Sequence, residues 1–276
     1  MSETRIGAKH ASVATHKMVL PGSMLAAARE GDSAKVWAWL DDPDAVEPRD
    51  VNDRSNTGAG TTLLMAATMF LDSFAKLDFV QELVRRGADY NFRDDDGLGI
   101  YGLACTGVEF GKSRADVFRD FTLQWLNAPD VYRPPKIVAS IILTMAKVPS
   151  RPLAEAVFAL VRAGVPLVCW INGEMTHFMS VEENSYPELA QDEHWIACRS
   201  LIAGVRAAGS WRAYVRLPRE EVLRLRSLVI RGRARPRVRT RAADPIVARV
   251  VRLPNELVWK VLAYWRCTSE VTGEVI

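Results

Sequence analysis

The stretch Gly60-Thr-Thr-Leu-Leu-Met-Ala-Ala67, followed by Val80-Gln-Glu-Leu-Val-Arg-Arg-Gly-Ala-Asp-Tyr-Asn91, decides the fold of this chain. Thr62 is placed to cap a first helix, because its hydroxyl can accept a hydrogen bond from an amide that the first turn leaves unpaired. Leu64 and Ala67 lie three residues apart and therefore share one face of that helix. The first half of the stretch thus predicts a short helix with an apolar buried face.

A second helix is predicted after the first. One apolar stripe recurs in it at helical spacing: Phe79, Val80, Leu83 and Val84. Gly87 follows where helices commonly end in the left-handed conformation. Asp89 and Asn91 then suit a tight turn. The two helices and this turn form one complete structural unit.

This unit resembles one ankyrin repeat. Of the pattern G-x-T-P-L-H-x-A, the chain keeps the following four positions: Gly60, Thr62, Leu64 and Ala67. Leu63 and Met65 replace the proline and the histidine of the pattern. The resemblance implies a helix–turn–helix unit that cannot bury its apolar face alone and needs stacked neighbours. It also implies a protein-binding surface rather than an enzyme.

Further units are predicted on both sides of the first. Residues 24–40 match a helix pair with its turn at Gly31-Asp32, and Ala104 belongs to a third unit whose second helix carries an apolar set: Phe118, Phe121, Trp125 and Leu126. A fourth unit ends at residues 160–164. Helices are also expected at 195–204 and 222–229, divided by residues 211–218. We therefore predict an all-α, ankyrin-type solenoid with a C-terminal helical cap.

The chain organisation expected from these patterns has five parts. They are a disordered N-terminal tail at 1–20, a repeat domain of about four to five units at 21–211, a capping helix at 212–230, an arginine-rich linker at 231–245, and a C-terminal helix and tail at 246–276. The spacing between units exceeds the usual 33 residues. Enlarged loops are therefore expected, and these shape a binding site.

The binding site is predicted on those loops, around residues 52–58 and 94–99. The candidate partner-binding residues are Arg54, Asn56, Tyr90, Phe92, Asp95 and Tyr101. The sequence does not identify the protein partner. We expect the chain itself to be monomeric.

Composition indicates an intracellular protein, cytoplasmic or nuclear. The longest uncharged apolar run, residues 137–146, is too short to cross a bilayer, so no membrane partner is expected. The first 20 residues lack the apolar segment of a secretory signal. Four cysteines lie far apart without paired spacing, as is typical of free thiols in a reducing compartment: Cys105, Cys169, Cys198 and Cys267.

Catalysis, a metal and a cofactor are not expected. Residues 107–113 nearly spell a phosphate-binding loop, but Thr106 stands where its first glycine is required, and a helix is predicted where the preceding strand should be. A loop between repeat helices is the better interpretation. Four residues could in principle ligate zinc, yet their spacing is not that of a structural zinc site: Cys169, His177, His194 and Cys198.

Positive charge is concentrated near the C-terminus. Residues 212–252 hold 13 arginines against three acidic residues, a net charge of +10, and since the whole chain carries +3, the remainder carries −7. Arginines occupy alternate positions at Arg231, Arg233, Arg235, Arg237, Arg239 and Arg241. In an extended chain they project to one side, which suits rows of phosphates or carboxylates. Nucleic-acid binding, docking to an acidic protein, an import signal and a plain linker all fit this pattern.

The C-terminal helix at 253–265 is amphipathic, with Pro254 in its first turn. Its start at Leu253-Pro254, followed by Glu256, Leu257, Val261 and Leu262, resembles the opening helix of an F-box. The candidate adaptor-binding residues of this helix are Leu257, Val261 and Trp265. An ankyrin array followed by an arginine-rich helix and a Leu-Pro helix also resembles ankyrin proteins with a SOCS box. Both resemblances imply recruitment of a cullin-type ubiquitin ligase. The alternative is that this helix packs back as a cap.

Overall fold

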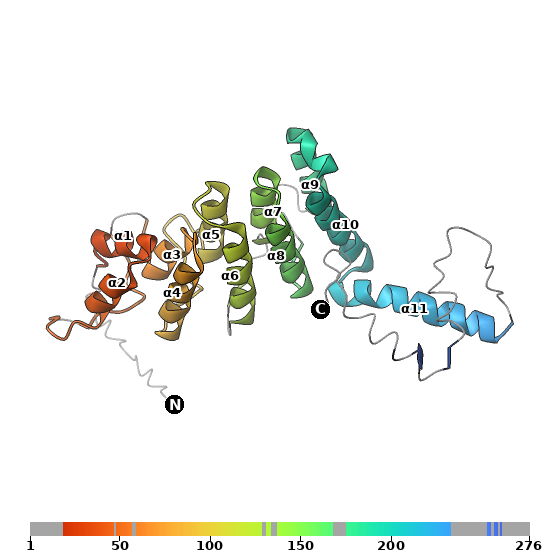
Figure 1. Cartoon of the computed structure of the whole chain (residues 1–276), viewed down its shortest axis with the longest axis horizontal. Helices are drawn as coiled ribbons and strands as arrows, with labels where there is room; N and C mark the ends of the chain where they lie inside the picture. The colour runs from red at the N-terminus through yellow and green to blue at the C-terminus, as the bar shows by residue number, and fades with distance from the viewer. Residues whose placement is uncertain are drawn as a thin grey trace, which may run out of the picture. The chain divides into compact units, whose positions relative to one another are not determined.

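The structure is a computed structural model that describes residues 19–46, 48–56, 59–128, 131–133, 137–167, 175–232, 253–254, 257–258 and 260. Every regular element in these ranges is a helix, accompanied by two isolated β-bridges, so the predicted all-α class is confirmed (Figure 1). The chain divides into two compact units, Met1–Val117 and Phe118–Ile276. Residues 1–18 of the predicted tail lie outside the described residues. Leu20, also assigned to that tail, is instead buried, and its amide donates to the Arg54 carbonyl at 3.0 Å.

The described part of the N-terminal unit is built from helix pairs. Its helices are α1 (Gly22–Glu30), α2 (Ser33–Leu40), α3 (Leu63–Thr68), α4 (Phe74–Arg85) and α5 (Ile100–Glu109), followed by the start of α6 (Ala115–Asn127). α2 packs on α1 and α4 packs on α3, while α1, α3 and α5 contact one another in order (Figure 1). The first helices of successive pairs thus form a continuous row within this unit.

Local sequence signals explain where these helices begin and end. The Thr62 hydroxyl accepts a hydrogen bond from the Met65 amide at 3.3 Å, and all six residues of α3 are buried. Gly31, directly after α1, and Gly87, two residues after the end of α4, both have a left-handed φ, of 79° and 95°. The Asp89 carboxylate accepts from the Asn91 amide at 2.8 Å. The predicted cap, the two glycine turns and the Asp-Asn turn are therefore confirmed.

The C-terminal unit contains most of α6 and the remaining described helices. These are α7 (Ile137–Lys147), α8 (Arg151–Arg162), α9 (Met175–Ser185), the short 3-10 helix η1 (Pro187–Gln191), α10 (Glu193–Ala208) and α11 (Trp211–Ile230). α7 packs on α8 and α9, and α10 contacts α8, α9, η1 and α11. α7 is the apolar run noted in the sequence, and most of its side chains are buried. None of the described helices combines the length and the apolar character needed to cross a membrane.

One boundary expected from the sequence is wrong. Residues 211–218 do not separate two helices, because α11 begins at Trp211 and continues through them. The break lies earlier, at Gly209, whose φ is 81°, and Ser210 then caps α11 by accepting from the Ala213 amide at 3.1 Å. A proline inside a helix removes its own amide donor and crowds the carbonyl four residues earlier, which kinks or ends many helices. Nevertheless, α11 continues through position 218.

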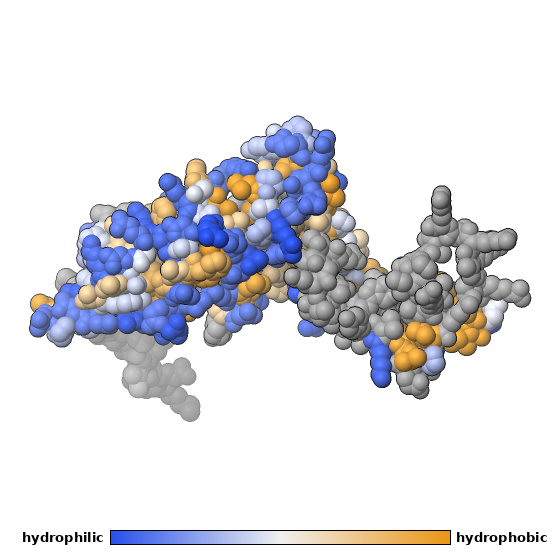
Figure 2. Space-filling view, viewed as in Figure 1, coloured by the Kyte–Doolittle hydropathy of each residue, from blue (hydrophilic) through white to orange (hydrophobic). Residues whose placement is uncertain are grey.

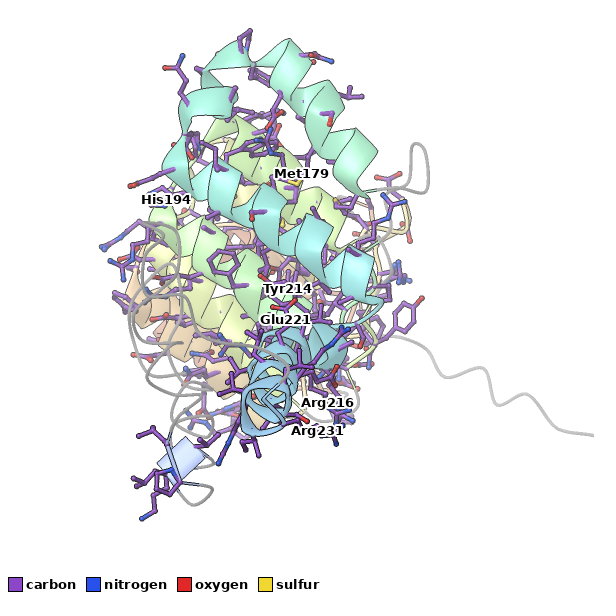
Figure 3. The ribbon with its side chains drawn as sticks, turned by 90° about the vertical axis from the view of Figure 1, so that its right-hand side faces the viewer. Met179, His194, Tyr214, Arg216, Glu221 and Arg231 are labelled. Carbon is purple, nitrogen blue, oxygen red and sulfur yellow. The ribbon has the colours of Figure 1, made fainter. Side chains whose placement is uncertain are left out.

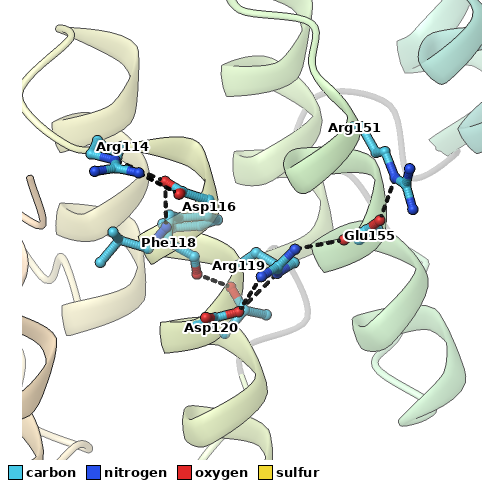
Figure 4. Close-up of polar contacts among 9 residues, drawn as sticks. Arg114, Asp116, Phe118, Arg119, Asp120, Arg151 and Glu155 are labelled. Atoms are coloured by element: carbon cyan, nitrogen blue, oxygen red, sulfur yellow. Dashed lines mark hydrogen bonds and ion pairs between the residues drawn. The ribbon is translucent and has the colours of Figure 1, made fainter. Parts of the chain in front are cut away.

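A polar network links α6 to α8 inside the C-terminal unit (Figure 4). The Arg119 guanidinium pairs with Asp120 at 2.8 Å and with Glu155 at 3.0 Å. Arg151 donates to the other oxygen of Glu155 at 2.8 Å. The Glu155 carboxylate is therefore held between two guanidinium groups, one from each helix.

Candidate partner-binding surface

The predicted site residues fall on two loops of the N-terminal unit and on the helix that follows them. Arg54 and Asn56 precede α3, whereas Tyr90, Phe92 and Asp95 lie between α4 and α5. We call residues 50–56, 59–62 and 86–99 the loop surface.

Arg54 is the centre of the hydrogen bonding on this surface. Its Nε donates to the Gly60 carbonyl at 2.9 Å, and its Nη2 donates to the Arg93 carbonyl at 3.0 Å and to Asp95 Oδ1 at 2.9 Å. Its own carbonyl accepts from the Leu20 amide. Two predicted site residues, Arg54 and Asp95, are thus brought together, and they bind each other while joining three chain segments.

Gly60 makes room for this contact. A Cβ atom at position 60 would lie 2.5 Å from Arg54 Nη2 and 2.7 Å from Asp95 Oδ1, and the φ of 68° disfavours any residue with a side chain. Adjacent backbone bonds complete the junction, from the Ser55 amide to the Thr61 carbonyl at 3.0 Å and from the Asp95 amide to the Ala59 carbonyl at 2.8 Å. The first glycine of the ankyrin-like pattern therefore has a steric role in this structure.

Asn52 cross-links this surface, and the sequence analysis did not single it out. Its Nδ2 donates to the Gly87 carbonyl at 2.9 Å and its Oδ1 accepts from the Asp89 amide at 2.9 Å. A side-chain amide can satisfy a backbone donor and a backbone acceptor at the same time. No local sequence signal could reveal this role, because its partners lie 35 and 37 residues further along the chain.

The aromatic residues differ in their exposure. Tyr90 and Phe92 are half-buried, and burial raises the pKa of the Tyr90 hydroxyl above its ordinary value of 10.0. Asn56 is exposed. Tyr101, in contrast, lies on α5 and is only 4% exposed, so its ring does not belong to the exposed surface.

The loop between α4 and α5 is closed at its tip by hydrogen bonds within the loop itself. Asp94 Oδ1 accepts from the Leu98 amide at 2.7 Å, and the Asp94 amide donates to the Leu98 carbonyl at 3.0 Å. The Arg93 side chain donates to the Gly97 carbonyl at 3.0 Å. The loop surface is therefore preformed rather than an open coil.

The stretch that nearly spells a phosphate-binding loop has a packing role. Its Gly107 lies inside α5, and a Cβ atom there would come within 2.2 Å of the Met69 carbonyl oxygen. The buried Ser113 hydroxyl accepts from the Leu71 amide at 2.8 Å and donates to the same Met69 carbonyl at 3.4 Å. The glycine and the serine thus pack against the connection between α3 and α4. The predicted loop is only partly correct, because residues 107–109 belong to α5 and only residues 110–114 connect α5 to α6.

The residues considered for zinc do not form a site among the described side chains. Cys198 is buried with its Sγ 3.7 Å from Met145 Sδ, and desolvation raises its pKa so far that the thiol stays protonated. His194 lies 3.7 Å from Glu193 instead. Cys169 and the side chain of His177 lie outside the described residues. Within those residues, no three histidine, cysteine or acidic side chains gather as a metal would require.

The C-terminal candidates are only partly described. Arg231 is exposed at the end of α11, whereas Arg233, Arg235, Arg237, Arg239, Arg241, Val261 and Trp265 lie outside the described residues. Leu257 is exposed. Its neighbour Val258 is fully buried against Val222 of α11, in a cluster completed by Leu223, Val229 and Leu253.

Comparison with known proteins does not assign this chain to a family. No protein-family model and no curated protein matches the chain.

Proposed function

We propose that this chain is a non-enzymatic adaptor of the ankyrin type that binds a protein partner through the loop surface. Stacked helix pairs supply the scaffold, and the ankyrin-like stretch from Gly60 to Asn91 supplies the loops. The observation that carries the proposal is the cross-linking of the two loops by the side chains of Asn52 and Arg54.

Cross-linked loops suit recognition because little conformational entropy is lost when a partner binds a preformed surface. Tyr90 and Phe92 lie on the cross-linked loop, and both residues are only half-buried. Aromatic side chains are enriched among the residues that dominate protein–protein binding energy. The surrounding polar groups of Asn56 and Asp95 would form the rim of such an interface.

The test is affinity purification of the full chain carrying Tyr90→Ala and Phe92→Ala together. The wild type should retain a specific protein partner that the double variant loses. Phe110→Ala is the matched control, because Phe110 is 69% exposed in the same unit but lies outside the loop surface. This control should retain the partner.

The far-ultraviolet circular dichroism of both variants should match the wild type, which excludes unfolding as the cause of a loss. Equal recovery of the partner by the wild type and the double variant would remove the loop surface as the binding site. Loss of the partner from the Phe110→Ala control would do the same.

A further inference from the structure

The chain enters the described part of the molecule beside the loop surface. Val19 forms a parallel bridge with Arg54, and the Leu20 amide donates to the Arg54 carbonyl at 3.0 Å. The Arg54 side chain in turn reaches Asp95 at 2.9 Å. A single arginine therefore separates the start of the described chain from the loop between α4 and α5, and residues 1–18 are joined to the molecule at this point.

The loop surface carries negative charge that its own arginines do not neutralise. It holds six aspartates against three arginines, a net charge of −3. Arg54 is bound to Asp95 and to two carbonyls, and Arg86 pairs with Asp41, which lies outside the loop surface. Among the described residues, the following aspartates of the loop between α4 and α5 form no ion pair with a lysine or an arginine: Asp89, Asp94 and Asp96.

Aromatic rings lie between these carboxylates. Tyr90 and Phe92, both half-buried, stand between Asp89 and Asp94 in the sequence. A carboxylate attracts the charged end of a lysine or arginine side chain, while an aromatic face attracts the cation and packs against its methylene groups. The loop surface therefore has the two kinds of group that together recognise a basic side chain.

A cation bound in this way already exists in the same unit. The Arg86 guanidinium lies 4.2 Å from the centre of the Trp37 ring and pairs with Asp41 at 2.8 Å. A ring and a carboxylate thus hold one guanidinium together. The loop between α4 and α5 offers the same pair of groups to a cation from elsewhere.

Residues 1–18 have the complementary charge. They hold one acidic residue against three basic ones, a net charge of +2: Glu3, Arg5, Lys9 and Lys17. Residues 19–117 of the same unit hold 17 acidic and ten basic residues, a net charge of −7. Hydrophilic residues cover much of this unit on the face seen in Figure 2. Eighteen residues span up to about 60 Å when extended, so the reach of the segment does not limit a contact with the loop surface.

The other cationic part of the chain is less suited to this contact. It belongs to the other compact unit, Phe118–Ile276. On α11, the exposed Arg216 and Arg231 share the helix with exposed carboxylates such as Glu221 (Figure 3). Residues 1–18, in contrast, are joined directly to the loop surface.

We propose that residues 1–18 dock onto the loop surface of the same chain, with their basic side chains on Asp89, Asp94 and Asp96. A short covalent tether raises the effective concentration to about 1 mM, so an intrinsic Kd of about 0.1 mM keeps about nine tenths of the molecules docked. The docked segment then competes with a protein partner for Tyr90 and Phe92. This competition rests on the proposed function, whereas the docking itself does not.

Hydrogen exchange of the full chain tests the docking. Arg5→Ser, Lys9→Ser and Lys17→Ser together give a neutral-segment variant that changes no described residue. Amides of residues 86–99 should exchange at least about threefold faster in this variant than in the wild type, because a docked segment shields them from solvent. Lys9→Arg with Lys17→Arg is the matched control, which retains the charge and should keep the wild-type rates.

Neutral replacements of the aspartates locate the contact. Asp89→Asn, Asp94→Asn and Asp96→Asn keep the oxygens that accept hydrogen bonds from the Asn91 and Leu98 amides. In this background, the neutral-segment substitutions should no longer change the exchange of residues 86–99. At an ionic strength of about 1 M, where charges are screened beyond about 3 Å, the wild type should exchange like the neutral-segment variant.

Equal exchange in the wild type and the neutral-segment variant would overturn the proposal. An acceleration that persists at high salt or in the asparagine background would also overturn it, because the charges would then not act on these aspartates. Protection that rises with protein concentration would assign the segment to the loop surface of a second copy instead. If the asparagine variant fails to fold, the comparison at low and high salt still decides the question.

The docking and the proposed function can fail separately. Absence of a partner in the affinity purification leaves the exchange result standing. Unchanged exchange, in turn, leaves the loop surface as the proposed partner-binding site.

Discussion

Arg54 shows how a single side chain organises the loop surface. It binds two carbonyls and one carboxylate from segments up to 41 residues away in the sequence. A guanidinium is suited to this position because its several N–H donors point in fixed directions within one plane. The residue predicted as a partner contact therefore positions the loops on which Tyr90 and Phe92 lie.

Gly60 is the residue on which this arrangement depends, so we expect Gly60→Ala to destabilise the fold by about 1–3 kcal/mol. About 1–2 kcal/mol comes from a side chain at a left-handed φ, and up to about 1 kcal/mol from displacing the Arg54–Asp95 ion pair. Urea unfolding followed by circular dichroism measures the free energy of unfolding.

Gly97→Ala is the matched control for this substitution. Gly97 has a similar φ of 77°, but no atom lies within 4 Å of the position that a Cβ would take. The Gly97→Ala variant should therefore lower the free energy of unfolding only by the cost of a side chain at a left-handed φ, about 1–2 kcal/mol. Equal losses in the two variants would show that the contact with Arg54 and Asp95 adds nothing.

At the scale of helices, the predictable features were those encoded by neighbouring residues. Thr62, Gly31 and Gly87 end or cap helices through groups only a few positions away, and all three were predicted correctly. The long-range contacts of Asn52 and the packing of Gly107 on the Met69 carbonyl were not predictable. They join segments from different helix pairs, and periodicity describes only one helix at a time.

The α6–α8 network makes the contact between these helices depend on pH. Burial works to raise the pKa of Glu155, but hydrogen bonds from Arg151 and Arg119 outweigh it, so the pKa lies below the ordinary value of 4.5. A carboxylate with a lowered pKa in the folded state stabilises the fold above its unfolded pKa, and this contribution is lost as the pH falls through the folded value.

We therefore expect Glu155→Gln to cost about 1 kcal/mol at neutral pH, where a partly exposed ionic network is worth that much. The difference from the wild type should shrink as the pH falls below about 4, because the wild-type carboxylate then becomes neutral as well. Urea unfolding of both proteins at a series of pH values measures this difference in the free energy of unfolding. A difference that stays constant down to pH 3 or so would show that the charge of Glu155 is not what links the helices.

At the scale of the whole molecule, the chain divides into two compact units, Met1–Val117 and Phe118–Ile276. The loop surface belongs to the first of them. The described helices make their main contacts with the next α-helix along the chain or with the one after it, as expected where stability is a sum of local terms and of interfaces between neighbouring helix pairs. A local defect should then loosen one unit without loosening the other.

Ser113→Ala tests this expectation in the N-terminal unit. It leaves the buried Leu71 amide without its acceptor, which costs about 1–3 kcal/mol, so backbone amides of α3 and α4 should exchange with deuterium at least about fivefold faster. Amides of α10 should be unchanged. Ser210→Ala is the reciprocal control, because it removes the cap of α11 and should speed exchange in α11 but not in α3. If Ser113→Ala accelerates α10 as much as α3, the two units unfold together and their stabilities are not separable.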